Sequence, residues 1–501
     1  MVTPSDTVNR RDLEVVVIGA GMSGLAAAEM LVGRGFRPTI LEKATEVGGT
    51  WRDNTYPGLF VDIPVGLYQM LFAPRYDWSH AYAPGWEIQA YLRRCFDELD
   101  LRRYVTFGME VVSAEWRDGR WMLTTKTGET RTADVVIAAT GFLHRKKMPM
   151  IPGMETFHGR QFHSAEWPDD LDVRGKCVAI VGSGSSGIQM VCALSEPKMD
   201  CQVTQYVRTP QWIETVRNPK AGRVRRLVGR LFPSVGARLQ ARLMERIEQD
   251  PRLGDPWWKL EPGPKRDAAQ LAFVEMIGVI DDPDLRAALT PDFPPGCKRI
   301  PKSPWYFRAV QRPNVRIIRR GVTKVVPHGI EEPDGTVNEY DVIVWATGFD
   351  THAYVRPMQV TGLDGVTLDD MWRDNDVFSY RGVAVPKLPN FFILNGPFSP
   401  VNNVTIPQTV NDEMAWICEV LAESVDKGCA FAPSDAATAE FVDWVSEAIP
   451  QTVWADGCVN WYQGAKGLPV IWPWYDSEQT AMFRDVRLDR LEPVPSRLAD
   501  R

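Results

Sequence analysis

Two stretches of this chain repeat one arrangement, in which a short apolar run is followed by three closely spaced glycines and a helix-forming segment. The apolar runs are Glu14–Ile18 and Cys177–Val181. Glycines in this spacing permit a tight turn and let the backbone approach a pyrophosphate at a helix N-terminus. The repeat therefore predicts an α/β fold with two Rossmann-like dinucleotide-binding domains. Its glycines are Gly19, Gly21 and Gly24 in the first stretch and Gly182, Gly184 and Gly187 in the second.

Each glycine motif also has a later apolar run that ends in Ala-Thr-Gly, as expected of a strand that joins the same sheet. These runs are Ala133–Ala138 and Asp341–Val344. Two strand–glycine–helix units, each with such an ending, predict two nested domains, and the helical stretch between the runs of the second unit predicts an insertion. The first domain is expected at residues 1–145 and 376–501, the second at 146–216 and 291–375, and the insertion at 217–290.

The residue at the end of the second strand of each unit indicates which dinucleotide it binds. In the first unit this residue is Glu42, whose carboxylate suits ribose hydroxyls and therefore FAD or NAD. In the second unit Arg208 and Thr209 stand there, and an arginine is a bidentate partner for the 2′-phosphate of NADP. We therefore predict FAD in the first domain and NADPH in the second. A surface arginine without a ligand is the alternative for Arg208.

The composition argues against several other classes of protein. The chain has 501 residues and a net charge of -7, so nucleic acid is not an expected partner. No uncharged apolar run reaches the roughly 18 residues of a membrane-spanning helix, and no signal peptide is recognisable. The eight cysteines are scattered without a CxxC pair, and the six histidines form no HxH or HxxxH pair. We expect a cytoplasmic protein with no disulfide framework, no metal site and no stable membrane insertion.

The helical insertion begins with a strongly basic run. A helix lying on a membrane surface is one interpretation of such a run. Pro233 and Gly236 interrupt any long amphipathic stripe, so we favour a solvated helical face. The tail after Leu488 is charged and contains proline, and we expect it to be loosely ordered. The arginines of the basic run are Arg223, Arg225, Arg226, Arg230, Arg238, Arg242 and Arg246.

Two longer patterns carry a resemblance to a known enzyme family. Residues 157–168 fit FxGxxxHxxxWP and residues 48–62 fit GGxWxxxxYPGxxxD, in every specified position. The chain thereby resembles the Baeyer–Villiger monooxygenases from Val15 to about Tyr475. The resemblance implies a class B flavoprotein monooxygenase with FAD- and NADP-binding domains. The fixed residues of the first pattern include Phe157, Gly159, His163 and Trp167.

The resemblance also implies roles for single residues. Arg299 would be the active-site arginine, and Asp62 would lie beside the flavin ring and orient that arginine, with a purely structural ion pair as the alternative. Lys298 would reach the NADP phosphate. His163 and Trp167 would couple domain movement to catalysis, and we expect His163 to be a structural hydrogen-bonding group rather than an acid or base. Further residues along the FAD or the cleft would be Gly49, Thr50, Trp51, Tyr68 and Trp461.

The implied activity is the insertion of one oxygen atom of O2 next to a ketone carbonyl, giving an ester or lactone through a C4a-peroxyflavin. Arg299 would keep the oxidant anionic and stabilise the oxyanion of the adduct. Oxygenation of sulfur or nitrogen is the alternative among enzymes, and a flavin-binding protein without activity is the alternative of another class. The expected partners are a small ketone and O2, with the protein a monomer or homodimer. Val65-Gly66 stands where similar sequences often have Ser-His, which leaves the ketone open.

Overall fold

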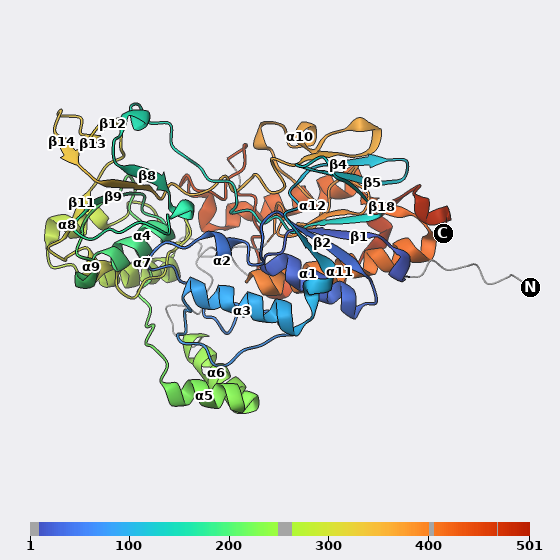
Figure 1. Cartoon of the computed structure of the whole chain (residues 1–501), viewed down its shortest axis with the longest axis horizontal. Helices are drawn as coiled ribbons and strands as arrows, with labels where there is room; N and C mark the ends of the chain where they lie inside the picture. Colours follow the sequence, from blue (N-terminus) through green and yellow to red (C-terminus); the bar gives the residue numbers. More distant parts are fainter. Residues whose placement is uncertain (1–9, 249–262, 400–404, 468, 501) are drawn as a thin grey trace, which may run out of the picture.

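The structure is a computed structural model that describes residues 10–248, 263–399, 405–467 and 469–500 of the chain (Figure 1). Two parallel sheets lie toward opposite ends of the long axis of the molecule, with the short helix α2, Thr50–Asp53, between them. The predicted α/β architecture is therefore correct. Within the described part of the chain, no helix combines the length and the apolar character needed to cross a bilayer.

The first sheet has the strand order β17-β7-β1-β2-β3, and all of its pairs are parallel. β1 is buried along its whole length, as expected of a strand covered on both faces. The helix α1, Met22–Gly33, follows the glycine turn and packs against the long helix α11, Ile406–Lys427. The strands are β1 Val15–Ile18, β2 Pro38–Glu42, β3 Val105–Phe107, β7 Val135–Ala138 and β17 Phe391–Ile393.

The second sheet repeats this design, with the strand order β11-β10-β9-β15-β8 and parallel pairs throughout. Its glycine turn leads into α4, Ser185–Leu194, which packs against the short helix α9, Tyr306–Ala309. The strands are β8 Arg160–His163, β9 Cys177–Val181, β10 Gln202–Tyr206, β11 Val315–Ile318 and β15 Val342–Trp345.

The two domains are nested because the last strand of the first sheet comes after the whole second sheet. One hydrophobic core joins residues of β1 and β7 to residues of β17 and α11, and a separate core lies around β9 and β10. The strand β16, Gln359–Thr361, pairs with β4, Val111–Arg117, of the first domain. The segment boundaries, including the change predicted at residue 375, stay predictions.

Three smaller sheets are found among the residues that the structure describes. The order β16-β4-β5-β6 forms a layer beside the first sheet, β12-β13-β14 lies beside the second, and β18 pairs with β19. The tail was expected to be loosely ordered, and this expectation was wrong. The tail contributes β19, and its residues Leu491 and Leu498 are buried against the hydrophobic core of the first sheet. The strands are β4 Val111–Arg117, β5 Arg120–Thr125, β6 Thr130–Ala133, β12 Lys324–Val326, β13 Gly329–Glu331, β14 Val337–Glu339, β18 Ala430–Pro433 and β19 Leu491–Val494.

The predicted insertion is helical wherever the structure describes it. α5 and α6 form a hairpin that projects from the body, below α3 in Figure 1. The side chain of Arg246 falls outside the described part of α6. The helices named so far and the remaining long ones are α3 Gly85–Glu98, α5 Arg223–Leu231, α6 Pro233–Glu248, α7 Pro264–Ile277, α8 Pro283–Leu289, α12 Asp435–Ala448 and α13 Asp476–Arg484.

The cysteine pattern was interpreted wrongly in one respect. Cys297 and Cys458 form a disulfide between segments 161 residues apart in the sequence, and both side chains are buried. The other six cysteines are free. Spacing along the chain could not indicate this pair, because the fold alone brings the two segments together.

Candidate cofactor and active site

A cavity of about 640 Å³ opens at the carboxyl ends of the first sheet, along the first glycine motif. Gly19 has φ +106°, and a Cβ atom there would lie 2.6 Å from the carbonyl oxygen of Ala139. A Cβ atom at Gly24 would overlap the carbonyl oxygen of Gly19. The turn is therefore built for residues without side chains, which leaves its backbone and the N-terminus of α1 facing the cavity.

Glu42 lies at the end of β2 in the wall of this cavity, and its carboxylate is almost fully buried. Oε2 accepts a hydrogen bond from the backbone N–H of Ala20 at 2.7 Å, and Oε1 accepts one from Ala44 at 2.9 Å. Arg52 also donates to Oε1, at 3.1 Å. The carboxylate thus braces the glycine turn as well as lining the cavity. Sequence reasoning did not anticipate Arg52, which the short helix α2 positions.

A second glycine segment lies directly beside the first in the cavity wall. Gly49 has φ +53°, and a Cβ atom there would lie 3.1 Å from the Cα atom of Gly21, so a bulky side chain would narrow the space between them. Thr50 and Trp51 begin α2 directly after it. The indole N–H of Trp51 donates to the hydroxyl of Tyr68 at 3.2 Å. Burial raises the pKa of Tyr68 to about 12, so this phenol stays neutral and can donate into the cavity.

Asp62 and Arg299, which lie far apart in the sequence, form a bidentate ion pair. Nη2 of Arg299 lies 2.8 Å from Oδ1 and 2.9 Å from Oδ2 of Asp62, and Nε lies 3.3 Å from Oδ2. The exposed fractions are 17% for the Asp62 side chain and 30% for that of Arg299, so the pair is partly open. The carboxylate raises the pKa of Arg299, which keeps the guanidinium charged. Tyr68 and Tyr462 are near enough to influence this charge.

The C-terminal segment that carries Trp461 is tied to the segment that carries Arg299. The side-chain amide of Asn460 donates to the carbonyl oxygen of Cys297 at 2.7 Å, beside the disulfide. The Trp461 ring stacks on Phe142, with 6.1 Å between centroids and an interplanar angle of 16°. Phe142 also lines the cavity at the end of β7. The stacking of Trp461 on Phe142 therefore places this C-terminal segment beside the first domain.

The cavity wall contains a buried polar atom without a partner. Oδ1 of Asn395 is buried and accepts no hydrogen bond, although its amide nitrogen donates to Ser23 Oγ at 3.3 Å. The position follows β17, and nothing in the local sequence singles it out. An unpaired acceptor in a polar cavity suits a ligand that donates hydrogen bonds. The glycine cradle and this acceptor together fit a dinucleotide such as FAD.

The second glycine motif lies beside the residues that follow β10. Ser183 Oγ donates to the carbonyl oxygen of Thr209 at 2.6 Å, which joins the turn to the strand end. Burial and the nearby charge of Arg208 lower the pKa of Lys298, so these two cations lie close to one another. Arg319, which sequence reasoning missed, donates to the carbonyl oxygen of Val207 at 3.2 Å. Three basic side chains therefore gather where a phosphate is expected.

The residues of the first fingerprint pack within the second domain. His163 is fully buried; Nδ1 accepts from the N–H of Ala165 at 3.2 Å, and Nε2 lies 2.9 Å from the carbonyl oxygen of Gly348. Burial lowers the pKa of His163, so the neutral ring that donates from Nε2 satisfies both contacts. A Cβ atom at Gly159 would overlap the backbone of Asp341 and the ring of Phe157. Trp167 packs edge-on against Phe162 at 5.4 Å.

Comparison with known proteins agrees with this geometry. A family model described as flavin-binding monooxygenase-like matches residues 12–228. The chain is 39% identical over 477 residues to an uncharacterised monooxygenase of Mycobacterium tuberculosis, with 94% of each chain covered. It is 35% identical over 496 residues to a Baeyer–Villiger monooxygenase of Streptomyces coelicolor, which covers 97% of this chain and 94% of that one.

Solved structures give the same result. The cyclohexanone monooxygenase from Rhodococcus bound to NADP+ superposes with a TM-score of 0.84 and 26% identity, over 96% of this chain and 99% of that chain. A steroid monooxygenase bound to NADP superposes with a TM-score of 0.83 and 26% identity, over the same shares. The chain belongs to the flavin-binding monooxygenase-like family and, within it, to the Baeyer–Villiger monooxygenases.

Proposed function

We propose that this protein uses FAD, NADPH and O2 to insert one oxygen atom next to the carbonyl of a small ketone, giving an ester or lactone. The observation that carries the proposal is the bidentate pair of Asp62 and Arg299, which holds a charged guanidinium near Tyr68, a residue of the cavity wall. Family membership supports the reaction class. The cytoplasmic location and the oligomeric state, monomer or homodimer, remain predictions.

The chain offers a separate place for each cofactor. FAD would lie along Gly19, Gly21 and Gly24, with Glu42 toward its ribose and Gly49, Thr50, Trp51 and Tyr68 along the rest. NADPH would lie along Gly182, Gly184 and Gly187, with Thr209 beside the turn. Arg208 and Lys298 repel one another, and a bound phosphate would relieve that repulsion. Bound FAD supplies the electron transfer and the activation of O2.

The role of Arg299 follows from its charge and its fixed direction. Oxygen attack on a carbonyl places negative charge on the former carbonyl oxygen, and a pre-positioned guanidinium stabilises that charge. Asp62 holds two of the guanidinium nitrogens, so it fixes where the cation points. Loss of one such stabilising group slows comparable reactions by roughly 100- to 1,000-fold.

The aromatic residues would keep water away from the reacting atoms. Trp461 stacks on Phe142, and Tyr462 lies 4.3 Å from the Trp461 ring, so apolar surface covers this part of the cleft. Exclusion of water strengthens the field of a fixed charge and protects reactive groups from hydrolysis. The linker residues Phe157, Gly159, His163 and Trp167 would set how the two domains meet.

Substitution of Arg299 tests the proposal. Purified Arg299→Ala enzyme is expected to keep its flavin and to be reduced by NADPH, but to form oxygenated product at least about 100-fold more slowly. Arg299→Lys is expected to recover part of the rate, because it restores the charge but not the bidentate geometry. Arg316→Ala, which removes an exposed arginine bonded to Asn338, is the matched control.

Product identification completes the test. The panel should contain cyclic, linear, aromatic and steroid ketones and also sulfides and amines, with NADPH consumption and products both measured. Esters or lactones that disappear with Arg299→Ala support the proposal. Normal ester formation by that variant would refute the role of the guanidinium, and oxygenation of sulfides or amines alone would point to the alternative activity. Bound flavin that NADPH cannot reduce would indicate a protein without this activity.

A further inference from the structure

The α5–α6 hairpin touches the body of the protein through small and polar residues. Gly229 and Gly236 are buried, and a Cβ atom at either position would overlap Tyr76. Gln240 Nε2 lies 3.5 Å from the carbonyl oxygen of Gly66. At these three positions the hairpin therefore presents no large apolar side chain to the protein, although Leu239 borders the same contact.

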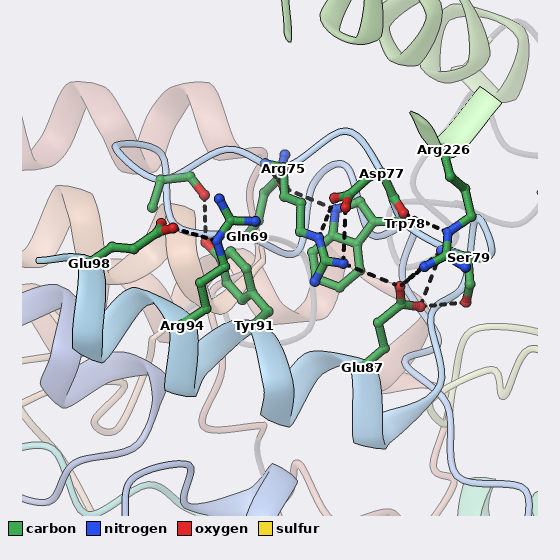
Figure 2. A network of polar contacts seen from close by, with 11 residues as sticks. Gln69, Arg75, Asp77, Trp78, Ser79, Glu87, Tyr91, Arg94, Glu98 and Arg226 are labelled. Atoms are coloured by element: carbon green, nitrogen blue, oxygen red, sulfur yellow. Dashed lines mark hydrogen bonds and ion pairs between the residues drawn. The ribbon is translucent and has the colours of Figure 1, made fainter. Parts of the chain in front are cut away.

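An ion network fixes this orientation (Figure 2). Arg226 of α5 donates from Nε to the carbonyl oxygen of Asp77 at 3.0 Å, and its Nη2 lies 3.9 Å from Glu87 Oε1. Glu87 is buried at the start of α3 and accepts from the backbone N–H of Ser79 at 3.0 Å. Arg75 joins the same carboxylate at 3.8 Å. The polar face of α5 is thus held against α3, and the opposite face points outward.

The outward face of α5 is apolar. Val224, Leu227 and Leu231 follow the i, i+3, i+7 spacing of one helical stripe, and their exposed fractions are 76%, 56% and 60%. At 3.6 residues per turn, the middle of this stripe lies about 160° around the helix from Gly229. Phe232, beside the bend between the helices, is 57% exposed. A helix in a globular protein normally turns such a stripe toward the core, and here it faces away.

Positive charge surrounds this apolar stripe. Residues 222–243 contain no Asp or Glu, although the whole chain has a net charge of -7. Exposed arginines flank the apolar side chains on both helices: Arg223, Arg230, Arg238 and Arg242. An isolated apolar patch would suit another protein surface equally well. An apolar stripe bordered by cations on an acidic protein suits a surface that is apolar beneath an anionic layer.

We propose that the α5–α6 hairpin docks the protein on the surface of an anionic lipid bilayer. Leu227, Leu231 and Phe232 enter the boundary between headgroups and acyl chains, and the flanking arginines pair with lipid phosphates. A second copy of the chain fits less well, because a symmetric contact would set these arginines against each other. The proposal replaces the solvated face favoured from the sequence. Pro233 begins α6 at this bend. The cationic surface is therefore divided between the two helices and does not form one uninterrupted stripe.

Vesicle binding by the full-length, flavin-loaded protein tests the proposal. Sedimentation should recover the protein with vesicles of equal parts phosphatidylcholine and phosphatidylglycerol, and not with phosphatidylcholine vesicles. Binding should weaken as salt rises. Each arginine near an anionic surface contributes about fivefold to the binding constant, so Arg223→Glu with Arg230→Glu should weaken binding by about 25-fold or more.

A second pair of substitutions separates the apolar contribution from charge. Leu227→Ser with Leu231→Ser should also abolish most binding, while Val337→Ser, at an exposed valine of β14 on the other side of the molecule, should leave it unchanged. All of these side chains are exposed, so flavin absorbance and melting temperature should match the parent protein.

Three results would overturn the proposal. The first is no recovery of the parent protein with the anionic vesicles at low salt. The second is binding that neither pair of substitutions reduces, which would place the contact elsewhere. The third is a parent dimer that the leucine substitutions convert to a monomer without any vesicle binding, which would assign the stripe to a second copy of the chain.

Discussion

The preference for NADPH over NADH should depend on the two cations beside the second glycine motif. Arg208→Ala removes one of them from the end of β10, at a side chain that is exposed. A hydrogen bond to a charged group contributes about 1.5–3 kcal/mol, and exposure reduces this toward the lower value. Since about 1.4 kcal/mol equals a tenfold change, KM for NADPH should rise roughly tenfold.

The structure also predicts how the substitution affects the neighbouring lysine. The charge of Arg208 contributes to the lowered pKa of Lys298, so Arg208→Ala should raise that pKa. Lys298 then retains part of the phosphate binding. Arg208→Ala and Lys298→Ala should therefore not act independently, because both would contact one phosphate group.

Initial rates with each cofactor provide the measurement. For Arg208→Ala, KM for NADH and kcat with NADPH should change less than about twofold, because NADH lacks the 2′-phosphate. Arg320→Ala is the matched control, since this arginine is half exposed and pairs with Glu332 at 3.2 Å. Equal losses with NADPH and NADH would refute the assignment of the 2′-phosphate to this cluster.

Three further predictions concern the frame of the site. Gly24→Ala should strip the protein of flavin, because the new Cβ atom overlaps the glycine turn, whereas Gly33→Ala in the same helix meets nothing within 4 Å and should leave the flavin content unchanged. Alkylation of the unfolded, unreduced protein should label six of the eight cysteines by mass spectrometry, and all eight after reduction; eight without reduction would exclude the Cys297–Cys458 bond. Burial lowers the pKa of His163 below its ordinary 6.5, so the unfolded state binds more protons and stability falls as pH drops below about 6.5. Denaturant titration should find His163→Gln less stable than the parent by about 1–2 kcal/mol near pH 7.5, with a smaller gap near pH 5.5, and a gap that widens in acid would contradict this.

Much of the fold was predictable because its signals are local in the sequence. The strand, the glycine turn and the following helix are contiguous, and the steric reason for each glycine acts within a few residues or against the adjacent strand. Glu42 follows from the same logic, since it ends the strand that lies next to β1. The family resemblance added Asp62 and Arg299, which no local pattern connects, and the structure joins them at 2.8 Å.

The features that the sequence did not predict depend on contacts between segments that lie far apart in the chain. Asn395 faces the cavity because β17 enters the first sheet beside β7, and its neighbours in the sequence carry no motif. Arg319 reaches the end of β10 because β11 pairs with that strand. The disulfide also needs the fold, since Cys458 meets Cys297 through the C-terminal segment.

The hairpin shows a different limit of sequence reasoning. A helical pattern specifies which residues share a face, but the direction of that face depends on what the rest of the protein presents to the helix. Here Glu87 is buried under α5 and binds Arg226, and Tyr76 leaves room for glycine alone. Turning the leucine stripe inward would separate this ion pair and leave the buried carboxylate with Arg75 as its remaining cation, which is unfavourable. The ion pair that holds Arg226 against the body of the protein therefore leaves Leu227 and Leu231 exposed on the opposite face of the helix.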